Sequence, residues 1–348
     1  MQFIIALVVT FIASIILTPY VKKLAIKVGA VDKPNYRKVH KQTMPRLGGL
    51  AIFLSFLIGV LLFIPDTIQA WPILLGGLII VAVGVLDDIK ELPAKSKLLG
   101  QLVAAVVTVA GGIQIDFITL PNGNEIEFGY FAIPITIIWI VAITNAINLI
   151  DGLDGLAAGV SAIAVLTISG LAISMGDPLM ALIGILLFGS TLGFLVFNFY
   201  PAKIFMGDTG SLFLGYMISV IAVMGLFKNV AIFSLVVPII ILGVPILDTT
   251  FAIVRRIVKK QPLSAPDKFH LHHCLIKLGF THRQTVIIIY AMSGLFSVAA
   301  IIFTRATLWG STLLLIGLLI LVELIVEVTG LISENYRPLL RFIDGKKK

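Results

Sequence analysis

The chain has 348 residues, of which 59% are hydrophobic and 13% charged, and its mean hydropathy is +1.09. A soluble core of this size does not need so much apolar surface, so the composition excludes an ordinary soluble protein and predicts an integral membrane protein. The formal net charge of +8 does not indicate a nucleic-acid partner, because the placement of the basic residues along the chain explains it.

Eleven apolar runs follow one another and predict an all-α polytopic membrane protein with about eleven transmembrane helices. The first run has no basic segment before it and no A-x-A cleavage site after it, so it predicts a retained helix rather than a signal peptide. The runs cover residues 2–19, 48–64, 71–86, 98–113, 130–147, 156–174, 179–196, 212–227, 231–251, 286–303 and 309–331.

The basic residues predict the orientation. Of the 26 Lys and Arg residues, all but Lys228 and Arg305 fall in one set of loops and in the C-terminal tail. The positive-inside rule then places the N-terminus outside and the C-terminus in the cytoplasm of a multi-pass plasma-membrane protein. We expect residues 1–348 to form a single membrane domain whose long cytoplasmic loops, 20–47 and 252–285, mark the functional face.

Six aspartates lie at or near the ends of apolar runs on this predicted cytoplasmic face. Carboxylates beside hydrocarbon are costly and normally mark function. Their clustering on one side predicts a single metal-dependent site on the cytoplasmic face. The six are Asp87, Asp88, Asp151, Asp154, Asp208 and Asp248.

The first chemical element is the pair Asp87-Asp88 at the end of the third run. Neighbours on a helix point about 100° apart, so one carboxylate can face a metal while the other acts as base or nucleophile. Lys97 opens the next run and is placed to reach back to a phosphate. The alternative is a polar helix end in water.

The second element is T-N-A-I-N-L-I-D-G-L-D-G, in which Asn148, Asp151 and Asp154 are spaced three apart. They share a face if the segment is helical, and they line a loop if the glycines open the chain. Oxygen ligands of this kind suit Mg²⁺ or Mn²⁺ rather than zinc. The alternative is a pair of simple turns.

The third element is F-M-G-D-T-G-S, residues 205–211, at the start of the eighth run. Its glycines and the positive end of a helix predict backbone amides that approach an anion. Asp208 is a candidate metal ligand, and Phe205 is a candidate to stack on a base. The alternative is a helix start capped by Thr209 or Ser211.

The fourth element is the inner loop that follows Asp248. Its histidines and arginines offer donors for a pyrophosphate or a sugar, although a plain surface loop is also open. A zinc site is disfavoured because H-x-H-H-C is too compact to surround one tetrahedral ion. The candidate residues are Arg255, Arg256, His270, His272 and His273.

Together these elements predict phosphoryl transfer at a membrane surface, where a divalent metal and cations position and neutralise phosphates. A transporter or lipid flippase is the alternative of a different class. Transporters place their acids near mid-membrane and often have repeated halves, and this chain has neither feature. Glu323 and Glu327, within the last run, are left outside the predicted site.

These motifs resemble those of the polyprenyl-phosphate N-acetylhexosamine-1-phosphate transferases, over nearly the whole chain. The matching blocks are R-K-V-H (37–40), M-P-R-L-G-G (44–49), VLDD, TNAINLIDGLDGLAAG, NFYPAKIFMGDTGS and DKFHLHH. The H-x-H-H block with Arg255-Arg256 is similar to the GlcNAc-1-phosphate branch, whose Gram-positive members initiate wall teichoic acid synthesis. The phospho-MurNAc-pentapeptide transferase branch, the alternative, usually has three consecutive histidines.

The resemblance implies that undecaprenyl phosphate attacks the β-phosphate of UDP-GlcNAc, giving undecaprenyl-diphosphate-GlcNAc and UMP. Besides these two substrates, membrane lipids are expected partners and a homodimer stays open. By motif, the resemblance implies that Asp208 with Asn148 ligates Mg²⁺ (Mn²⁺ as alternative), and that Asp87 or Asp88 deprotonates or orients the lipid phosphate. It implies that Phe205 stacks on uracil, that Asp151 and Asp154 contact the nucleotide, and that Lys97 contacts the pyrophosphate. The residues implied to bind the sugar and phosphate are Arg255, Arg256, His270, His272 and His273.

Overall fold

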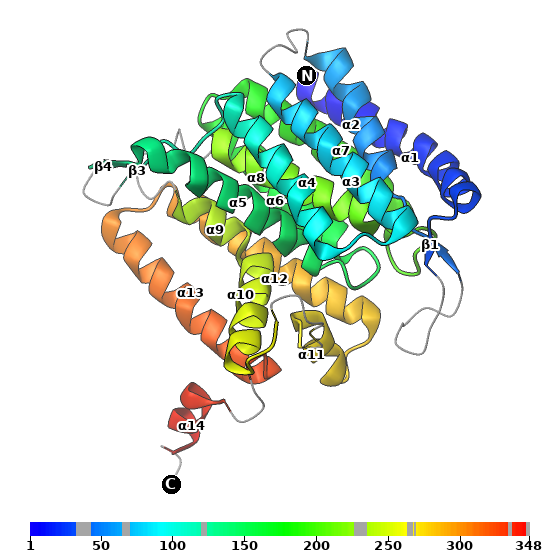
Figure 1. The fold of residues 1–348 in the computed structure, drawn as a ribbon. Coiled ribbons are helices and arrows are strands. Elements are labelled where there is room, and N and C mark those ends of the chain that lie inside the picture. Colours follow the sequence, from blue (N-terminus) through cyan, green and yellow to red (C-terminus); the bar gives the residue numbers. More distant parts are fainter. Residues whose placement is uncertain are drawn as a thin grey trace.

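The computed structural model describes most of the chain and is mainly helical (Figure 1). The motif at 37–40 and Lys268 lie outside the described residues, and of 343–345 only the backbone is described. The described ranges are residues 1–32, 43–64, 70–119, 124–225, 235–262, 267, 269–332 and 336–345.

Helices account for nearly all regular structure in these ranges. They are α1 (Gln2–Val28), α2 (Gly49–Phe63), α3 (Trp71–Lys90), α4 (Ala94–Ala110), η2 (Gly129–Phe131), α5 (Ala132–Leu149), α6 (Leu156–Ser174), α7 (Pro178–Asn198), α8 (Gly207–Gly225), α9 (Val236–Ile241), α10 (Gly243–Val258), α11 (Leu271–Lys277), α12 (His282–Phe303), α13 (Leu308–Thr329) and α14 (Pro338–Gly345).

Two short antiparallel hairpins complete the described structure. Strand β1 (Val31–Asp32) pairs with β2 (Met44–Pro45), so that Val31 lies opposite Pro45. Strand β3 (Phe117–Thr119) pairs with β4 (Glu125–Glu127), so that Ile118 lies opposite Ile126. The first hairpin matters for the site, because Pro45 of β2 and the residues that follow it form backbone hydrogen bonds with residues 205 and 206.

Eight helices of the described chain are long and apolar enough to cross a membrane: α1, η2 with α5, and α3, α6, α7, α8, α12 and α13. The protein is therefore an all-α, multi-pass membrane protein. Helix α2, with 15 residues, is a shorter apolar helix, and α4 has 17.

The ninth apolar run, expected as one span over 231–251, is interrupted. Helix α9 ends at Ile241, Leu242 leaves the helical path, and α10 starts at Gly243. Pro245 has no N–H to donate to the carbonyl of Ile241, which explains the break. The break lets α10 leave the bundle, and α10, α11 and α14 extend from its lower side in Figure 1.

Helix α8 lies at the centre of the bundle. It packs against α3 and α5 and also contacts α2 and α6, and 83% of its most apolar 18-residue stretch is buried. Helix α13 is the opposite case, with 11% of the corresponding stretch buried. The start of α8 therefore has a fixed position in the bundle, and we call its first turn, from Gly207, the platform. The site residues on α3, α4 and α5 lie around it.

Candidate active site

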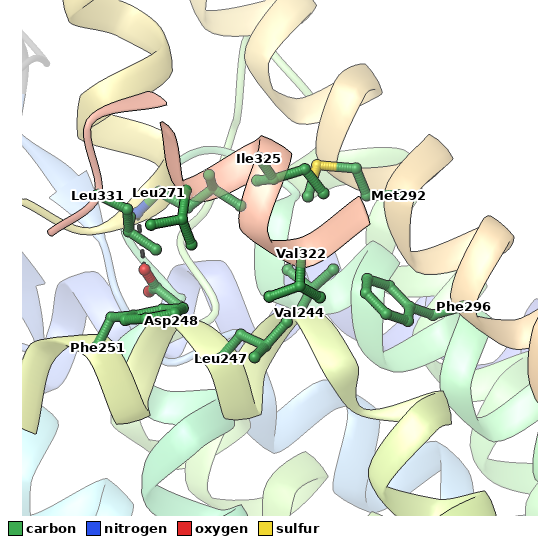
Figure 2. Close-up of a pocket in the computed structure, with 11 residues that line it drawn as sticks. Val244, Leu247, Asp248, Phe251, Leu271, Met292, Phe296, Val322, Ile325 and Leu331 are labelled. Atoms are coloured by element: carbon green, nitrogen blue, oxygen red, sulfur yellow. Dashed lines mark hydrogen bonds between the residues drawn. The ribbon is translucent and has the colours of Figure 1, made fainter. Parts of the chain in front are cut away.

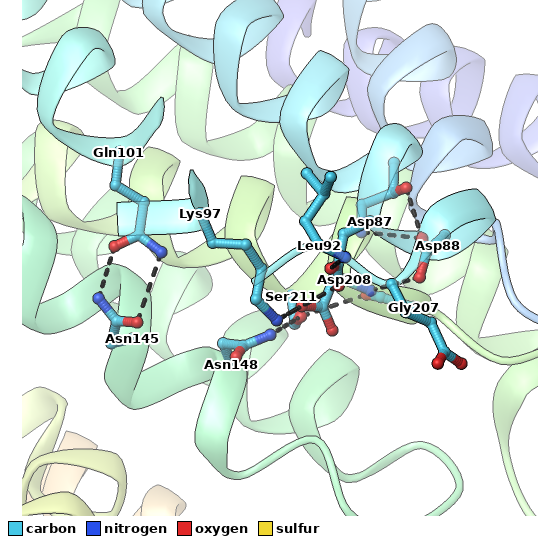
Figure 3. Close-up of polar contacts among 12 residues, drawn as sticks. Asp87, Asp88, Leu92, Lys97, Gln101, Asn145, Asn148, Gly207, Asp208 and Ser211 are labelled. Carbon is cyan, nitrogen blue, oxygen red and sulfur yellow. Dashed lines mark hydrogen bonds and ion pairs between the residues drawn. The ribbon is translucent and has the colours of Figure 1, made fainter. Parts of the chain in front are cut away.

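Polar side chains from four helices meet beside the start of α8. The ammonium of Lys97, in the first turn of α4, lies between two carboxylates: its Nζ is 3.3 Å from Oδ2 of Asp87 and 2.8 Å from Oδ2 of Asp208 (Figure 3). Asn148, near the end of α5, donates through Nδ2 to Oγ of Ser211 at 2.8 Å. We define the acidic cluster as Asp87, Asp88, Lys97, Asn148 and Asp208.

The two adjacent aspartates of α3 have different surroundings. Asp87 accepts the N–H of Leu92 through Oδ1 at 2.7 Å and turns Oδ2 towards Lys97. Asp88 is 2% exposed and points into the start of α8. Asp87 is therefore the member of the pair that borders the space around Lys97.

Asp88 caps α8 from another helix. Its Oδ1 accepts the N–H of Asp208 at 3.0 Å, and its Oδ2 accepts the N–H and the hydroxyl of Thr209 at 3.0 and 2.6 Å. These amides belong to the first turn of α8, where no intrahelical acceptor exists. The cap explains why α8 begins at Gly207, five residues before the predicted run.

This contact corrects one prediction. The amides at the start of α8 were expected to approach an anion of the substrate, and their anion is the protein's own Asp88. Neither Thr209 nor Ser211 is the cap that the alternative predicted, because the hydroxyl of Thr209 donates to Asp88 and that of Ser211 donates to the carbonyl of Gly207.

Glycines allow the helices to approach one another closely around this platform. A Cβ added to Gly49 of α2 would lie 2.0 Å from the backbone N of Gly210, and one added to Gly84 of α3 would lie 2.4 Å from Cα of Thr209. Such distances are far below van der Waals contact. The positions of α2 and α3 against α8 therefore depend on the absence of side chains at these two residues.

The segment around β2 holds Phe205. The N–H of Phe205 donates to the carbonyl of Pro45 at 2.8 Å, and its carbonyl accepts the N–H of Gly48 at 3.0 Å. Nearby, Nε of Arg46 donates to the carbonyl of Asp88 at 3.1 Å. The half-buried Phe205 is thus fixed by its backbone on both sides, while Arg46 links this segment to the end of α3.

The loop between α5 and α6 carries Asp151 and Asp154 towards the acidic cluster. Desolvation, and then the negative charges of Asp208, Asp88 and Asp154, raise the pKa of Asp151 to about 8. Asp154 has a structural contact, because its Oδ2 accepts the N–H of Ala202 at 3.0 Å. The two acids of D-G-L-D-G therefore differ: Asp151 faces like charge, and Asp154 ties down the next loop.

Two residues that sequence reasoning missed organise this loop. Nε2 of His282, at the start of α12, accepts the N–H of Asp154 at 3.0 Å. Asn198 accepts the N–H of Gly155 at 3.1 Å and donates to the carbonyl of Ile204 at 3.0 Å, so one amide links two loops. The one available signal was that each is a polar residue at the end of an apolar run.

We define the histidine loop as the described residues 267 and 269–277, which include the short helix α11. This segment reaches the same D-G-L-D-G loop. The rings of His270 and His272 are nearly parallel with centroids 6.0 Å apart, and His273, which is exposed, has its ring 4.2 Å from that of His272. A Cβ added to Gly152 would lie 2.4 Å from Nε2 of His272. Burial and the charge of His273 lower the pKa of His272 to about 3, so this imidazole is neutral.

The two arginines of α10 are buried. Arg255 donates through Nε and Nη2 to Oδ2 of Asp267 at 3.0 and 2.6 Å, and through Nη1 to the carbonyl of Leu331. Nε of Arg256 is buried and has no hydrogen-bond partner among the described residues. Arg255 thus joins α10, the histidine loop and the segment just after α13.

The two glutamates of α13, which were left outside the predicted site, are also outside these clusters. Glu327 is fully buried, and its carboxylate accepts the N–H groups of Leu339 and Leu340 at 2.6 and 2.8 Å. It therefore caps the start of α14. Oε1 of Glu323 is buried and has no hydrogen-bond partner among the described residues.

The oxygens beside Asp208 suit a hard divalent cation by their chemistry, since they are two carboxylates and an amide. In this structure the ammonium of Lys97 lies between the carboxylates of Asp87 and Asp208. Within the described ranges, no group of three or more His, Cys, Asp or Glu residues has a metal-binding arrangement. The donor set fits magnesium if Lys97 turns towards a phosphate.

Comparisons with known proteins found a matching family model and similar relatives. The family model described as glycosyl transferase family 4 matches residues 70–226. The chain is 51% identical to a probable undecaprenyl-phosphate N-acetylglucosaminyl 1-phosphate transferase of Bacillus subtilis, over 98% of this chain and 96% of the relative. It is 37% identical to a decaprenyl-phosphate N-acetylglucosaminephosphotransferase of Mycolicibacterium smegmatis, over 95% and 88%. A phospho-N-acetylmuramoyl-pentapeptide-transferase of Halalkalibacterium halodurans is 35% identical, over 86% and 95%.

Proposed function

The chain belongs to glycosyl transferase family 4, the polyprenyl-phosphate sugar-1-phosphate transferases, and from this premise we propose that it transfers GlcNAc-1-phosphate from UDP-GlcNAc to undecaprenyl phosphate. The products are undecaprenyl-diphosphate-GlcNAc and UMP. This is the first step of teichoic acid or related cell-surface glycan synthesis.

One observation carries the proposal: Lys97 joins Asp87 and Asp208 beside the start of α8. An ammonium held by two carboxylates is in place to bind the diphosphate of the donor while the acids handle a cation and the acceptor phosphate. The family relationship supports the substrate class, and this geometry supports the acidic cluster as the proposed place of the transfer.

The transfer forms one bond and breaks one. An oxygen of the lipid phosphate attacks the β-phosphorus of UDP-GlcNAc, and the bond from that phosphorus to the bridging oxygen breaks, so UMP leaves. Asp87 accepts the proton of the lipid phosphate or orients it. Direct attack is favoured over a covalent enzyme intermediate, because a phosphate monoester is already anionic near pH 7. We propose that Asp87 is the aspartate of the pair that acts on the substrate, and that Asp88 supports the reaction by capping the start of α8.

Mg²⁺, or Mn²⁺ in its place, is the proposed cofactor, held by Asp208 and Asn148. When bound, such an ion neutralises phosphate charge. Lys97 moves from the two carboxylates to the pyrophosphate as the donor binds. On this proposal the enzyme is a Mg²⁺-dependent phosphotransferase, so we expect chelation to remove its activity.

The remaining residues bind the two ends of the donor. Phe205 stacks on uracil from its fixed backbone, and Asp151 and Asp154 border the nucleotide. His270, His272 and His273 contact the sugar and its phosphate, with His272 as a neutral donor or acceptor. Arg255 and Arg256 support that side from α10.

The proposed topology has eleven spans in a single domain of the plasma membrane: the eight long helices, the shorter α2 and α4, and the interrupted run of α9 and α10. The N-terminus lies outside, and the C-terminus and the active site lie on the cytoplasmic face. A reporter fused after Lys348 tests it. We expect a cytoplasmic signal, because nearly all basic residues would then lie inside. An extracellular signal would overturn the orientation.

The decisive experiment measures UMP release by the purified protein in detergent, with undecaprenyl phosphate and Mg²⁺. UDP-GlcNAc, UDP-GalNAc and UDP-MurNAc-pentapeptide are compared side by side, each with and without EDTA. Turnover of UDP-GlcNAc alone, lost with EDTA, supports the proposal. Turnover of the pentapeptide donor would instead place the chain with the 35% identical relative, and no UMP from folded protein would favour a transporter.

A further inference from the structure

A buried carboxylate on α10 holds one histidine of the loop. Asp248 is 2% exposed and His270 is 6% exposed. Oδ2 of Asp248 is 2.8 Å from Nδ1 of His270. Its Oδ1 accepts the N–H of Leu271 at 2.7 Å, the contact drawn in Figure 2. Both oxygens are therefore directed at two consecutive residues of the histidine loop.

The other side of Asp248 is apolar. It borders a cavity of about 20 Å³ between α10, α12 and α13, and the remaining side chains that line this cavity are apolar, among them Phe251, Met292 and Val322 (Figure 2). A carboxylate in such surroundings is stable as an anion only when it is paired and hydrogen-bonded. An ionised carboxylate only accepts hydrogen bonds, so Nδ1 of His270 must carry the proton of this contact.

The ring of His270 lies next to residues that border the D-G-L-D-G loop, where the donor is proposed to bind. Its ring lies parallel to that of His272, which abuts Gly152 of the D-G-L-D-G loop. With the proton of the contact on Nδ1, the second nitrogen, Nε2, is left for a ligand. A carboxylate that fixes tautomer and ring direction in this way is a recurring device around functional histidines.

We infer that Asp248 is a positioning residue of the transfer reaction: it holds His270 with the proton on Nδ1 and presents Nε2 to the sugar-phosphate of the donor. The inference rests on the proposed function for the identity of that ligand. Its structural part, the tautomer of His270, is independent of any activity.

The test is Asp248→Asn. The amide oxygen still accepts the N–H of Leu271, whereas the amide nitrogen donates to Nδ1 and moves the proton of a neutral ring to Nε2. We expect kcat for UMP release to fall about 10- to 100-fold with a smaller change in KM, and Asp248→Glu to restore part of it. In a His270→Gln background, Asp248→Asn causes no further loss, because its effect passes through the ring.

The second readout is the ¹⁵N spectrum of histidine-labelled protein, with the His270 signals assigned by His270→Gln. We expect Nδ1 protonation in the wild type and Nε2 protonation in Asp248→Asn. Asp267→Asn is the matched control, because Asp267 lies on the same loop but bonds Arg255, and it leaves the tautomer unchanged.

Three results would overturn the inference: wild-type turnover in Asp248→Asn, an equal loss in the His270→Gln background, or Nε2 protonation in the wild type. The last is measured on the unmutated protein, so the inference remains testable if Asp248→Asn does not fold. If the wild type releases no UMP but His270 is protonated on Nδ1, the proposed function fails and the Asp248–His270 pair stands.

Discussion

The acidic cluster and the histidine loop meet at the D-G-L-D-G loop, but they are built differently. The acidic cluster rests on the most buried helix, through a carboxylate cap and backbone contacts that only glycine allows. The histidine loop rests on side-chain pairs, Asp248 with His270 and Arg255 with Asp267. We interpret the first as the rigid part that serves the phosphates of any donor and the second as the adjustable part that meets the sugar.

The largest effect should come from Asp208→Asn. Removing this carboxylate removes the proposed metal ligand and one partner of Lys97, so kcat for UMP release should fall about 1,000-fold or more. His273→Gln, in the exposed part of the histidine loop, should instead raise KM for UDP-GlcNAc a few-fold (about 3- to 10-fold). Asp116→Asn, which changes an acid beside β3, is the control. Equal effects of both changes on kcat would erase the distinction between the two regions.

The next effect concerns stability. In Gly49→Ala the new methyl group meets the backbone of Gly210, which cannot move aside, so we expect a loss of about 1–3 kcal/mol in the free energy of unfolding. The measurement is the thermal midpoint in detergent. Gly170→Ala in α6 is the matched control, because a Cβ there meets nothing within 4 Å. If the two variants melt alike, the platform is less tightly packed than its glycines indicate.

A smaller effect is expected at Arg255. Lysine cannot reproduce the two-nitrogen contact with Asp267 together with the bond to Leu331, so Arg255→Lys should loosen the histidine loop and lower kcat/KM about 10-fold. Arg283→Lys, on an exposed arginine of α12, should leave kcat/KM unchanged. A wild-type kcat/KM for Arg255→Lys would mean that one positive charge beside Asp267 is enough to hold the histidine loop.

The smallest effect is a difference in pH dependence. The pKa of Asp151 is raised to about 8 in the folded protein, so the folded state holds this proton more tightly than the unfolded chain. The stabilising contribution of this group is complete below about pH 4 and is lost progressively as the pH rises through the folded pKa near 8. Asp151→Asn should flatten the decline in thermal midpoint measured without divalent cations.

Asp267 should behave in the opposite way. Burial raises its pKa, but hydrogen bonds from Arg255 and from the N–H of Phe269 hold the pKa below its usual value. Its contribution is therefore present above pH 4 and lost as the pH falls through the lowered pKa. Asp267→Asn should lower the midpoint near pH 7 and converge with the wild type in acid. Parallel profiles for both variants would contradict the electrostatic contrast between the two regions.

Hydropathy predicted the membrane class and most helices, because long apolar runs leave few alternatives. The break between α9 and α10 was readable from Pro245, but the continuous apolar run hid it. Motif spacing brought Asp87, Lys97, Asn148 and Asp208 into the predicted site, and the structure places them together. The role of Asp88 was not predictable, because its partners lie 120 and 121 residues later in the chain. The contacts of Arg255 with Asp267 and of His270 with Asp248 were not predictable for the same reason, because the fold and not the local sequence decides which side chains meet.

The cap from Asp88 to α8 has a consequence for biosynthesis. Helix α3 leaves the ribosome long before the amides of residues 208 and 209 exist, so its terminal carboxylate must wait at the membrane surface without them. Helix α8, in turn, is made without a cap of its own and completes its first turn only on docking against α3. Assembly of the bundle and completion of the first turn of α8 are thus a single event, and a nascent chain that stops before α8 lacks the N–H groups that Asp88 accepts.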